Sequence, residues 1–239
     1  MIQLKDFTIG FENRRLLDNV STSFRKSKLT ALIGRNGTGK STLLKAICGL
    51  NDDYKGEILI DGENIRKIPR NRFATLLAYV NTQRPRMSNL RCKEVVALGR
   101  SPYTGWNGKL SEEDFKIVDK AIDLVGMKGY ENRYFNSLSD GESQKIMIAR
   151  AIAQDTKIII LDEPTSFLDL PMRHELVEIL KELTIEEKKT ILFSTHELDV
   201  AIRLCDYIGL IDAGKIYNLP VKEMVSFIKD THHSFESFL

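Results

Sequence analysis

Short runs of apolar residues give the first indication of the fold of this chain. In residues 29–33, 158–161 and 191–193, apolar side chains follow one another instead of alternating with polar ones. Such runs are typical of strands buried on both faces of a parallel sheet. A helical pattern follows each run, most clearly at residues 172–183, where an apolar stripe lies opposite charged side chains. This alternation predicts βαβ crossovers and therefore an α/β fold.

Two other segments predict strands of a different kind. Ile2, Leu4 and Phe7 predict a first strand, because the N-terminus lacks the apolar core of a signal peptide. Within residues 50–80, the sequence GEILIDG predicts an antiparallel strand that is closed by a turn at Asp61-Gly62. We therefore expect a smaller antiparallel β region beside the parallel sheet.

Residues 84–138 contain only helical patterns and so interrupt the alternation of strands and helices. Their two helical patterns, 93–99 and 112–125, are separated by the turn-forming sequence SPYTGWNGK. We interpret this region as an inserted helical subdomain, and the tail after residue 215 has a single helical pattern at 222–229. The prediction is one domain, residues 1–239, with a core and β region over about 1–83 and 155–239 and a helical subdomain over about 84–154.

Composition and charge narrow the functional classes. No segment approaches the roughly 20 apolar residues that cross a membrane, so membrane association is expected to depend on a partner. The chain has 35 basic and 33 acidic residues without basic clusters, which argues against a nucleic-acid partner. Cys48, Cys92 and Cys205 lie far apart, as is typical of reduced thiols in the cytoplasm.

The strongest chemical signal is GRNGTGKST, which lies between a buried strand and a helical pattern. It matches the phosphate-binding P-loop, in which backbone N–H groups, the lysine and the hydroxyl hold the phosphates of ATP and its Mg²⁺. The predicted ATP-binding residues are Gly34, Arg35, Asn36, Gly37, Thr38, Gly39, Lys40, Ser41 and Thr42. Lys40 is also a candidate catalytic residue that reaches the β- and γ-phosphates, and Ser41 is a candidate Mg²⁺ ligand.

A P-loop alone is compatible with a kinase, a GTPase or an ATPase, so a second site must decide. In KIIILDEPTSFLD, an apolar strand ends in Asp162 and Glu163 at the sheet edge where ligands bind. We predict that Asp162 holds Mg²⁺ through water and that Glu163 is the general base. In ILFSTHELD, another apolar strand ends at His196, which we expect to contact the γ-phosphate. The pair His232-His233 lies in a polar tail and is not expected to bind metal.

The sequence SLSDGESQKIMIARAIAQD predicts a buried helix that ends at Ala153. Ser139 is its expected N-cap, and Glu142 completes a capping box. Because the helix is apolar on almost every side, its N-terminus is expected to be held in place, with free N–H groups suited to an anion.

The order GRNGTGKST, LSDGE, IIILDEP, SFLD and STH closely resembles the ATP-binding-cassette (ABC) family over nearly the whole chain. The resemblance implies a P-loop NTPase core and ATP hydrolysis. In that family two subunits enclose two ATP molecules head to tail, each between the P-loop of one subunit and the signature helix of the other. The resemblance therefore implies a homodimer.

The resemblance also implies roles for individual residues. Ser139 and Gly141 would contact the γ-phosphate across the dimer interface, Asp169 would link the two sites, and Phe11 would stack on adenine. The signature, usually LSGGQ, contains Asp140 and Glu142 in this chain. A carboxylate within ~4 Å of a phosphate would cost about 4 kcal/mol at an effective dielectric near 20, so we expect both acids to point away from it.

Other positions also depart from the family pattern. The loop in which the family carries a Mg²⁺-binding glutamine places Thr82 at that position and Gln83 one residue later. Gln83 is our candidate ligand, with Thr82 as the alternative. Phe11 replaces a common tyrosine and Ser27 a common glycine, and neither change removes a required group.

The sequence VALGRSPYTGW resembles the branch of the family that energises uptake of iron-siderophores, haem and cobalamin. This resemblance implies a peripheral ATPase subunit on the cytoplasmic face of the plasma (inner) membrane, with integral-membrane permease subunits as partners and, indirectly, a substrate-binding protein. The alternatives are an importer subunit for a different substrate and a soluble, non-transport ABC ATPase. The LSDGE and IIILDEP motifs make an unrelated P-loop kinase a remote third possibility.

Overall fold

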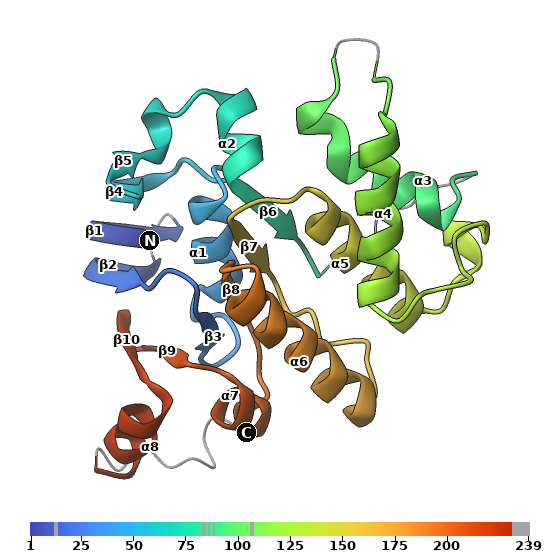
Figure 1. The fold of residues 1–239 in the computed structure, drawn as a ribbon. Helices are drawn as coiled ribbons and strands as arrows, with labels where there is room; N and C mark the ends of the chain where they lie inside the picture. Colours follow the sequence, from blue (N-terminus) through green and yellow to red (C-terminus); the bar gives the residue numbers. More distant parts are fainter. Residues whose placement is uncertain (12–13, 83–84, 86, 88, 106–107, 231–239) are drawn as a thin grey trace.

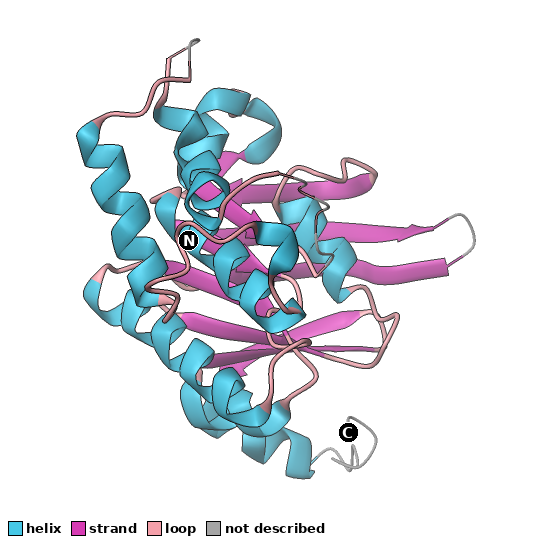
Figure 2. Ribbon diagram, turned by 90° about the vertical axis from the view of Figure 1, so that its right-hand side faces the viewer, coloured by secondary structure: helices cyan, strands magenta, loops and turns pink. Residues whose placement is uncertain are grey.

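Two β-sheets and the helices that cover them make up the molecule (Figure 1). The computed structural model describes residues 1–239 apart from 12–13, 83–84, 86, 88, 106–107 and 231–239. Figure 2 shows the strands layered together, with most of the long helices along one side of them. Among the described residues, no helix has both the length and the apolar character needed to cross a membrane.

The larger sheet has six strands in the order β10-β9-β3-β8-β7-β6. Pairing is parallel from β9 to β6, and β10 is antiparallel to β9. The strands are β3 (Leu29–Ile33), β6 (Leu77–Val80), β7 (Ile158–Leu161), β8 (Thr190–Ser194), β9 (Tyr207–Asp212) and β10 (Lys215–Pro220). The predicted parallel strands are confirmed as β3, β7 and β8, which lie side by side.

The larger sheet separates two hydrophobic cores, which explains why its central strands β3, β7 and β8 are almost continuously apolar. Ile159 and Leu161 of β7 face the core shared with the helices that follow β7 and β8. Ile158 and Ile160 face the core shared with the smaller sheet. Because side chains alternate between the faces of a strand, burial of both faces requires apolar residues at every position.

The smaller sheet is antiparallel, in the order β2-β1-β4-β5. Its strands are β1 (Ile2–Phe11), β2 (Arg14–Phe24), β4 (Tyr54–Ile60) and β5 (Glu63–Asn64). The predicted turn is confirmed: Asp61 and Gly62 have positive φ angles of 53° and 87° and connect β4 to β5.

The prediction of a small antiparallel β region over residues 50–80 was wrong in its second half. A 3₁₀ helix η1 (Ile65–Lys67) and helix α2 (Arg70–Leu76) follow β5, and residues 77–80 form β6 of the larger sheet. β6 pairs in parallel with β7, about 80 residues later in the chain. Periodicity within four residues carries no information about such a distant partner.

The helices of the middle region pack around α5. They are α3 (Cys92–Ala97), η2 (Leu98–Tyr103), α4 (Glu112–Leu124), η3 (Phe135–Ser137) and α5 (Asp140–Ala153). α5 packs against α3 and α4. One expectation was wrong: the helix predicted at 93–99 ends at Ala97, and η2 extends through Ser101, Pro102 and Tyr103, which we expected to form a turn.

The remaining helices flank the larger sheet. They are α1 (Lys40–Ile47), α6 (Leu170–Glu186), α7 (Leu198–Leu204) and α8 (Val221–Asp230). α6 contains the predicted pattern at 172–183 and is longer at both ends; it begins at Leu170 because Asp169 caps it and Pro171 lies in its first turn. β10 was not predicted, because its residues are mostly half-buried at the sheet edge and lack a clear pattern.

A buried ion pair connects η2 to the neighbouring helices. Arg100 Nε lies 2.8 Å from Asp114 Oδ1, and the same guanidinium donates to Ala153 O at 2.9 Å. Asp114 also accepts hydrogen bonds from the Ser111 amide at 2.9 Å and the Ser111 hydroxyl at 2.6 Å. The bonds from Ser111, followed by those from Arg100, lower the pKa of Asp114 to about 2.

We expect Asp114→Asn to destabilise the protein at pH 7 by about 3 kcal/mol, because Arg100 would remain buried without its counter-charge. The contribution of Asp114 should be complete above its unfolded pKa of about 3.9 and disappear as the pH falls toward about 2. Urea unfolding at pH 7 and pH 3 would measure both effects. Asp119→Asn is the control, since its pair with Lys93 is exposed; equal losses in the two variants would contradict the expectation.

Candidate functional site

The P-loop connects β3 to α1 at the carboxyl edge of the larger sheet. Gly39 is the N-cap of α1, and its φ of 105° is unfavourable for other residues. A Cβ on Gly39 would also lie 3.0 Å from Leu16 Cβ. The first N–H groups of α1 have no partner within the helix, so the loop presents donors suited to an anion.

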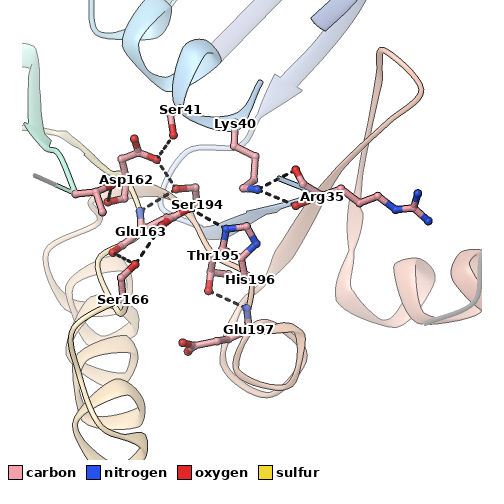
Figure 3. A network of polar contacts seen from close by, with 12 residues as sticks. Arg35, Lys40, Ser41, Asp162, Glu163, Ser166, Ser194, Thr195, His196 and Glu197 are labelled. Atoms are coloured by element: carbon pink, nitrogen blue, oxygen red, sulfur yellow. Dashed lines mark hydrogen bonds and ion pairs between the residues drawn. The ribbon is translucent and has the colours of Figure 1, made fainter. Parts of the chain in front are cut away.

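Lys40 lies over this loop. Its Nζ donates to Gly34 O at 2.7 Å and to Arg35 O at 3.3 Å (Figure 3). The residue is only 5% exposed. Burial lowers the pKa of Lys40, and the nearby Glu163 and Asp162 carboxylates act in the opposite direction. An ammonium held among loop carbonyls and N–H groups is suited to charge-assisted bonding with phosphate.

Asp162, at the end of β7, joins the P-loop helix to the neighbouring strand. Its Oδ1 accepts from Ser41 Oγ at 2.9 Å and from Ser194 Oγ at 2.6 Å (Figure 3). Ser194, the last residue of β8, is fully buried. We did not single out Ser194 from the sequence, although its place before Thr195 and His196, at the end of a strand parallel to β7, was a signal for it.

Glu163 has a positive φ of 48°, which is uncommon for a residue with a side chain and costs about 1 kcal/mol or more. Hydrogen bonds hold this conformation. Its amide donates to Ser194 Oγ at 2.8 Å, and Ser166 Oγ donates to Glu163 O at 3.0 Å and to Oε2 at 3.2 Å. The strained backbone therefore fixes the direction in which the carboxylate leaves the end of β7.

His196 lies against this carboxylate, with 2.8 Å between its Nε2 and Glu163 Oε1 (Figure 3). Both side chains are partly exposed, at 40% for His196 and 28% for Glu163. The structure thus brings together the two residues predicted from separate strands. A carboxylate paired with an imidazole is an arrangement that can accept and hold a proton.

The candidate Mg²⁺ loop lies next to Asp162. Thr82 Oγ1 donates to Asp162 O at 2.9 Å, and the Asp162 amide donates to Val80 O at 2.8 Å. Gln83 lies outside the described residues. Thr82 therefore lies at the site. The predicted role of Gln83 as a Mg²⁺ ligand stays a prediction.

Phe11 ends β1 and is 63% exposed. It is paired with Arg14 on β2, whose Nη2 donates to Gly37 O at 3.2 Å. This bond joins the hairpin to the P-loop, so Phe11 belongs to a strand end that borders the loop. Arg14 is a further site residue that we did not single out from the sequence.

The other predicted residues of the P-loop form a turn and the start of α1. Thr38 Oγ1 donates to Arg35 O at 2.9 Å and closes a turn within the loop. Arg35 and Asn36 are exposed, and Thr42 lies half-buried in the first turn of α1.

The signature segment begins α5, away from the P-loop. Ser139 is the N-cap of α5 and accepts from the Glu142 amide at 3.3 Å. Glu142 Oε2 accepts from the Ser139 amide at 2.8 Å and from Ser139 Oγ at 2.9 Å, which confirms the predicted capping box. These bonds lower the pKa of Glu142. Asp140 and Gly141 form the first turn of α5, which lies among the middle helices in Figure 1.

Asp169, predicted to link two sites, caps α6. Its Oδ1 accepts from the Met172 amide at 3.0 Å. The loop from Glu163 to Asp169 therefore begins at a residue with a strained backbone and ends at the residue that caps α6. Its position in the chain makes it the connection between β7 and α6.

Comparison with known proteins agrees with this geometry. Residues 17–166 match the family model described as ABC transporter. The chain is 36% identical over 206 residues to the achromobactin transport ATP-binding protein of Dickeya dadantii, covering 86% of this chain and 77% of that protein. It is 35% identical over 208 residues to the iron(3+)-hydroxamate import ATP-binding protein of Bacillus subtilis, covering 87% of this chain and 77% of that one.

Solved structures agree as well. A dimeric structure of a bacterial ABC transporter cassette matches with a TM-score of 0.82 and 28% identity, over 92% of this chain and 99% of that chain. A dimeric, post-hydrolysis ATP-binding cassette bound to ADP and Pi matches with a TM-score of 0.81 and 26% identity, over the same shares of the two chains. With its P-loop and its Glu163–His196 pair, the chain belongs to the ABC transporter family and is an ATPase of that family.

Proposed function

We propose that this ATPase energises the import of a metal chelate as a peripheral subunit of a membrane transporter. The observation that carries the catalytic part is the meeting of Lys40, Asp162, Glu163 and His196 at one sheet edge. The import of a chelate is supported by relatives named for achromobactin transport and iron(3+)-hydroxamate import. A third relative, the petrobactin import ATP-binding protein of Bacillus anthracis, is 34% identical over 98% of this chain and 86% of that protein.

The residues at the P-loop fit ATP together with Mg²⁺. The Ser41 hydroxyl and the Asp162 carboxylate lie 2.9 Å apart, and oxygen atoms of this kind are the ligands that Mg²⁺ prefers. Ser41 and Asp162 would hold the ion, with Thr82 or Gln83 from the neighbouring loop. Bound Mg²⁺ would neutralise phosphate charge. Lys40 and the N–H groups of α1 would bind the β- and γ-phosphates, and Phe11 would stack on the adenine.

Glu163 is the proposed general base. Its carboxylate accepts the proton of the attacking water, and His196 orients the carboxylate through the 2.8 Å contact. We also propose that His196 contacts the γ-phosphate when ATP is bound. The hydrogen bonds of Ser194 and Ser166 keep the base from turning away from the end of β7.

The signature segment is proposed to complete the site of a second copy of the chain. Ser139 and Gly141 begin α5 on the middle helices, while the P-loop begins α1 beside the larger sheet (Figure 1). A dimer would bring each signature to the partner's nucleotide, and the dimeric cassettes that match this fold support this arrangement. Glu142 is turned back onto Ser139, which keeps its charge directed at the helix cap. Asp169 would lie between the two sites.

A cavity of about 1040 Å³ is the proposed docking surface for the permease. It lies where η1 and α2 meet β6 and the end of α5. Its lining includes apolar side chains, two arginines and one acidic residue: Leu50, Ile65, Ile68, Phe73 and Leu77 with Arg66, Arg70 and Asp52. This chemistry suits a short helix with apolar and acidic side chains, presented by a membrane subunit on its cytoplasmic side.

We expect Glu163→Gln to retain ATP binding and to lower turnover at least about a hundredfold, because the amide cannot accept the proton of water. The variant should accumulate as an ATP-bound dimer. Phosphate release and size-exclusion chromatography with ATP would measure the two effects. Glu178→Gln, on the exposed face of α6, is the control. Near-normal turnover of Glu163→Gln would exclude Glu163 as the base.

Lys40→Ala should weaken ATP binding at least about tenfold, since a charge-assisted bond to phosphate is lost. A titration with ATP would measure the dissociation constant directly. Lys45→Ala is a matched control, because Lys45 is exposed in the same helix. Equal affinities in the two variants would contradict the proposed role.

Affinity purification from detergent-solubilised membranes tests the transport function. The wild-type chain should bring along a polytopic membrane protein, whose bound ligand then identifies the chelate. Phe73→Asp should lose this partner and keep basal ATPase activity, while Phe115→Asp on α4 should keep both. Purification of the wild-type chain without a membrane partner would instead support a non-transport ATPase.

A further inference from the structure

Arg173 connects the two segments that carry the catalytic pair. It lies in the first turn of α6, and its Nε donates to Leu168 O at 2.6 Å. Its Nη1 lies 2.8 Å from Glu197 Oε1. Leu168 belongs to the loop that follows Glu163, and Glu197 follows His196 directly. One guanidinium thus holds both segments beyond the ends of β7 and β8.

The ion pair is largely shielded from water, so it is expected to be stronger than a surface pair. The side chains of Arg173 and Glu197 are 28% and 20% exposed. Burial raises the pKa of Glu197, and the charge of Arg173 acts against that rise. A guanidinium that bridges two different acceptors also fixes their relative direction, because its planar N–H groups cannot rotate independently.

The distance between Glu163 and His196 depends on the relative position of these segments. Near the strand ends, Ser194 holds the Glu163 amide at 2.8 Å. The two side chains, however, meet beyond that point, at 2.8 Å between His196 Nε2 and Glu163 Oε1. Arg173 is a second tie between the same two segments, through Leu168 and Glu197.

The loop held by Arg173 also rests on the signature helix. A Cβ added to Gly141 would lie 3.2 Å from Phe167 O and 3.3 Å from Leu168 Cδ2. Arg173 therefore holds a carbonyl of the residue whose side chain lies against the first turn of α5. A shift of this loop would therefore disturb both Glu163, where the loop begins, and the contact with Gly141 in the signature segment.

We propose that Arg173 is a positioning residue for ATP hydrolysis, which sets the separation of Glu163 and His196 by tying Leu168 to Glu197. The inference rests on the proposed roles of Glu163 and His196. Arg173 acts through these residues and does not itself touch the nucleotide. Its loss should therefore reduce turnover without weakening the binding of ATP to the P-loop.

The test compares Arg173→Met, which keeps the length of the side chain, with Arg173→Lys, which restores the charge but only one donor group. In the full-length protein, Arg173→Met should lower kcat about tenfold to a hundredfold and change the Kd for ATP less than about twofold. Arg173→Lys should recover part of kcat. Arg203→Met, on the exposed side of α7, is the control.

A double-mutant cycle with Glu197→Gln separates positioning from general destabilisation. If Arg173 acts through Glu197, the double variant should have a kcat no lower than about half that of Arg173→Met alone. Thermal melts of each variant show whether it is folded at the assay temperature. If Arg173→Met does not fold, Arg173→Lys and Glu197→Gln should still show a lowered kcat with unchanged Kd.

The two levels of proposal fail in different ways. Normal turnover of Glu163→Gln would overturn the proposed base and the inference with it. Loss of turnover in Glu163→Gln together with normal kcat in folded Arg173→Met would overturn the inference alone. Multiplicative effects of Arg173→Met and Glu197→Gln on kcat, or weakened ATP binding in Arg173→Met, would also overturn it.

Discussion

The parallel pairing of β7 with β8 is the constraint on which the catalytic site depends. Parallel strands end at the same edge of a sheet, so Asp162 and Glu163 after one strand meet Ser194 and His196 after the other. The buried Ser194 hydroxyl fixes the positions of these residues relative to one another, because it donates to the Asp162 carboxylate and accepts from the Glu163 amide. Together with the bonds from Ser166, that bridge holds the positive φ of Glu163.

The position of β3 brings the phosphate loop to the same edge. β3 pairs with β8 on the side opposite β7, so the start of α1 faces the carboxyl ends of both strands. The Ser41 hydroxyl can therefore reach Asp162 although the two residues are 121 positions apart. Two hydrophobic cores hold these strands from both faces, which makes the sheet a rigid base for groups that must not move relative to one another.

The loops beyond the strands need additional ties, because backbone pairing ends with the sheet. Ser166 bonds to Glu163, Asp169 caps α6, and Arg173 joins Leu168 to Glu197. The same loop lies against Gly141 at the start of α5. A single chain thus couples the half of the site that would bind its own nucleotide to the signature segment that would serve a second copy.

The sequence by itself determined those features that depend on neighbours a few residues away. Continuous apolar runs predicted β3, β7 and β8, the Asp61-Gly62 pair predicted its turn, and Ser139 with Glu142 predicted the capping box. These patterns are readable because burial, turns and caps are local requirements.

Only the tertiary structure decided which distant residues meet. The pairing of β6 with β7, the bridge through Ser194, the contact of His196 with Glu163 and the tie through Arg173 all depend on strand order and helix placement. No periodicity within a segment encodes a partner that lies tens of residues away. Which distant residues meet is decided when burial of both sheet faces brings the strand ends to one edge.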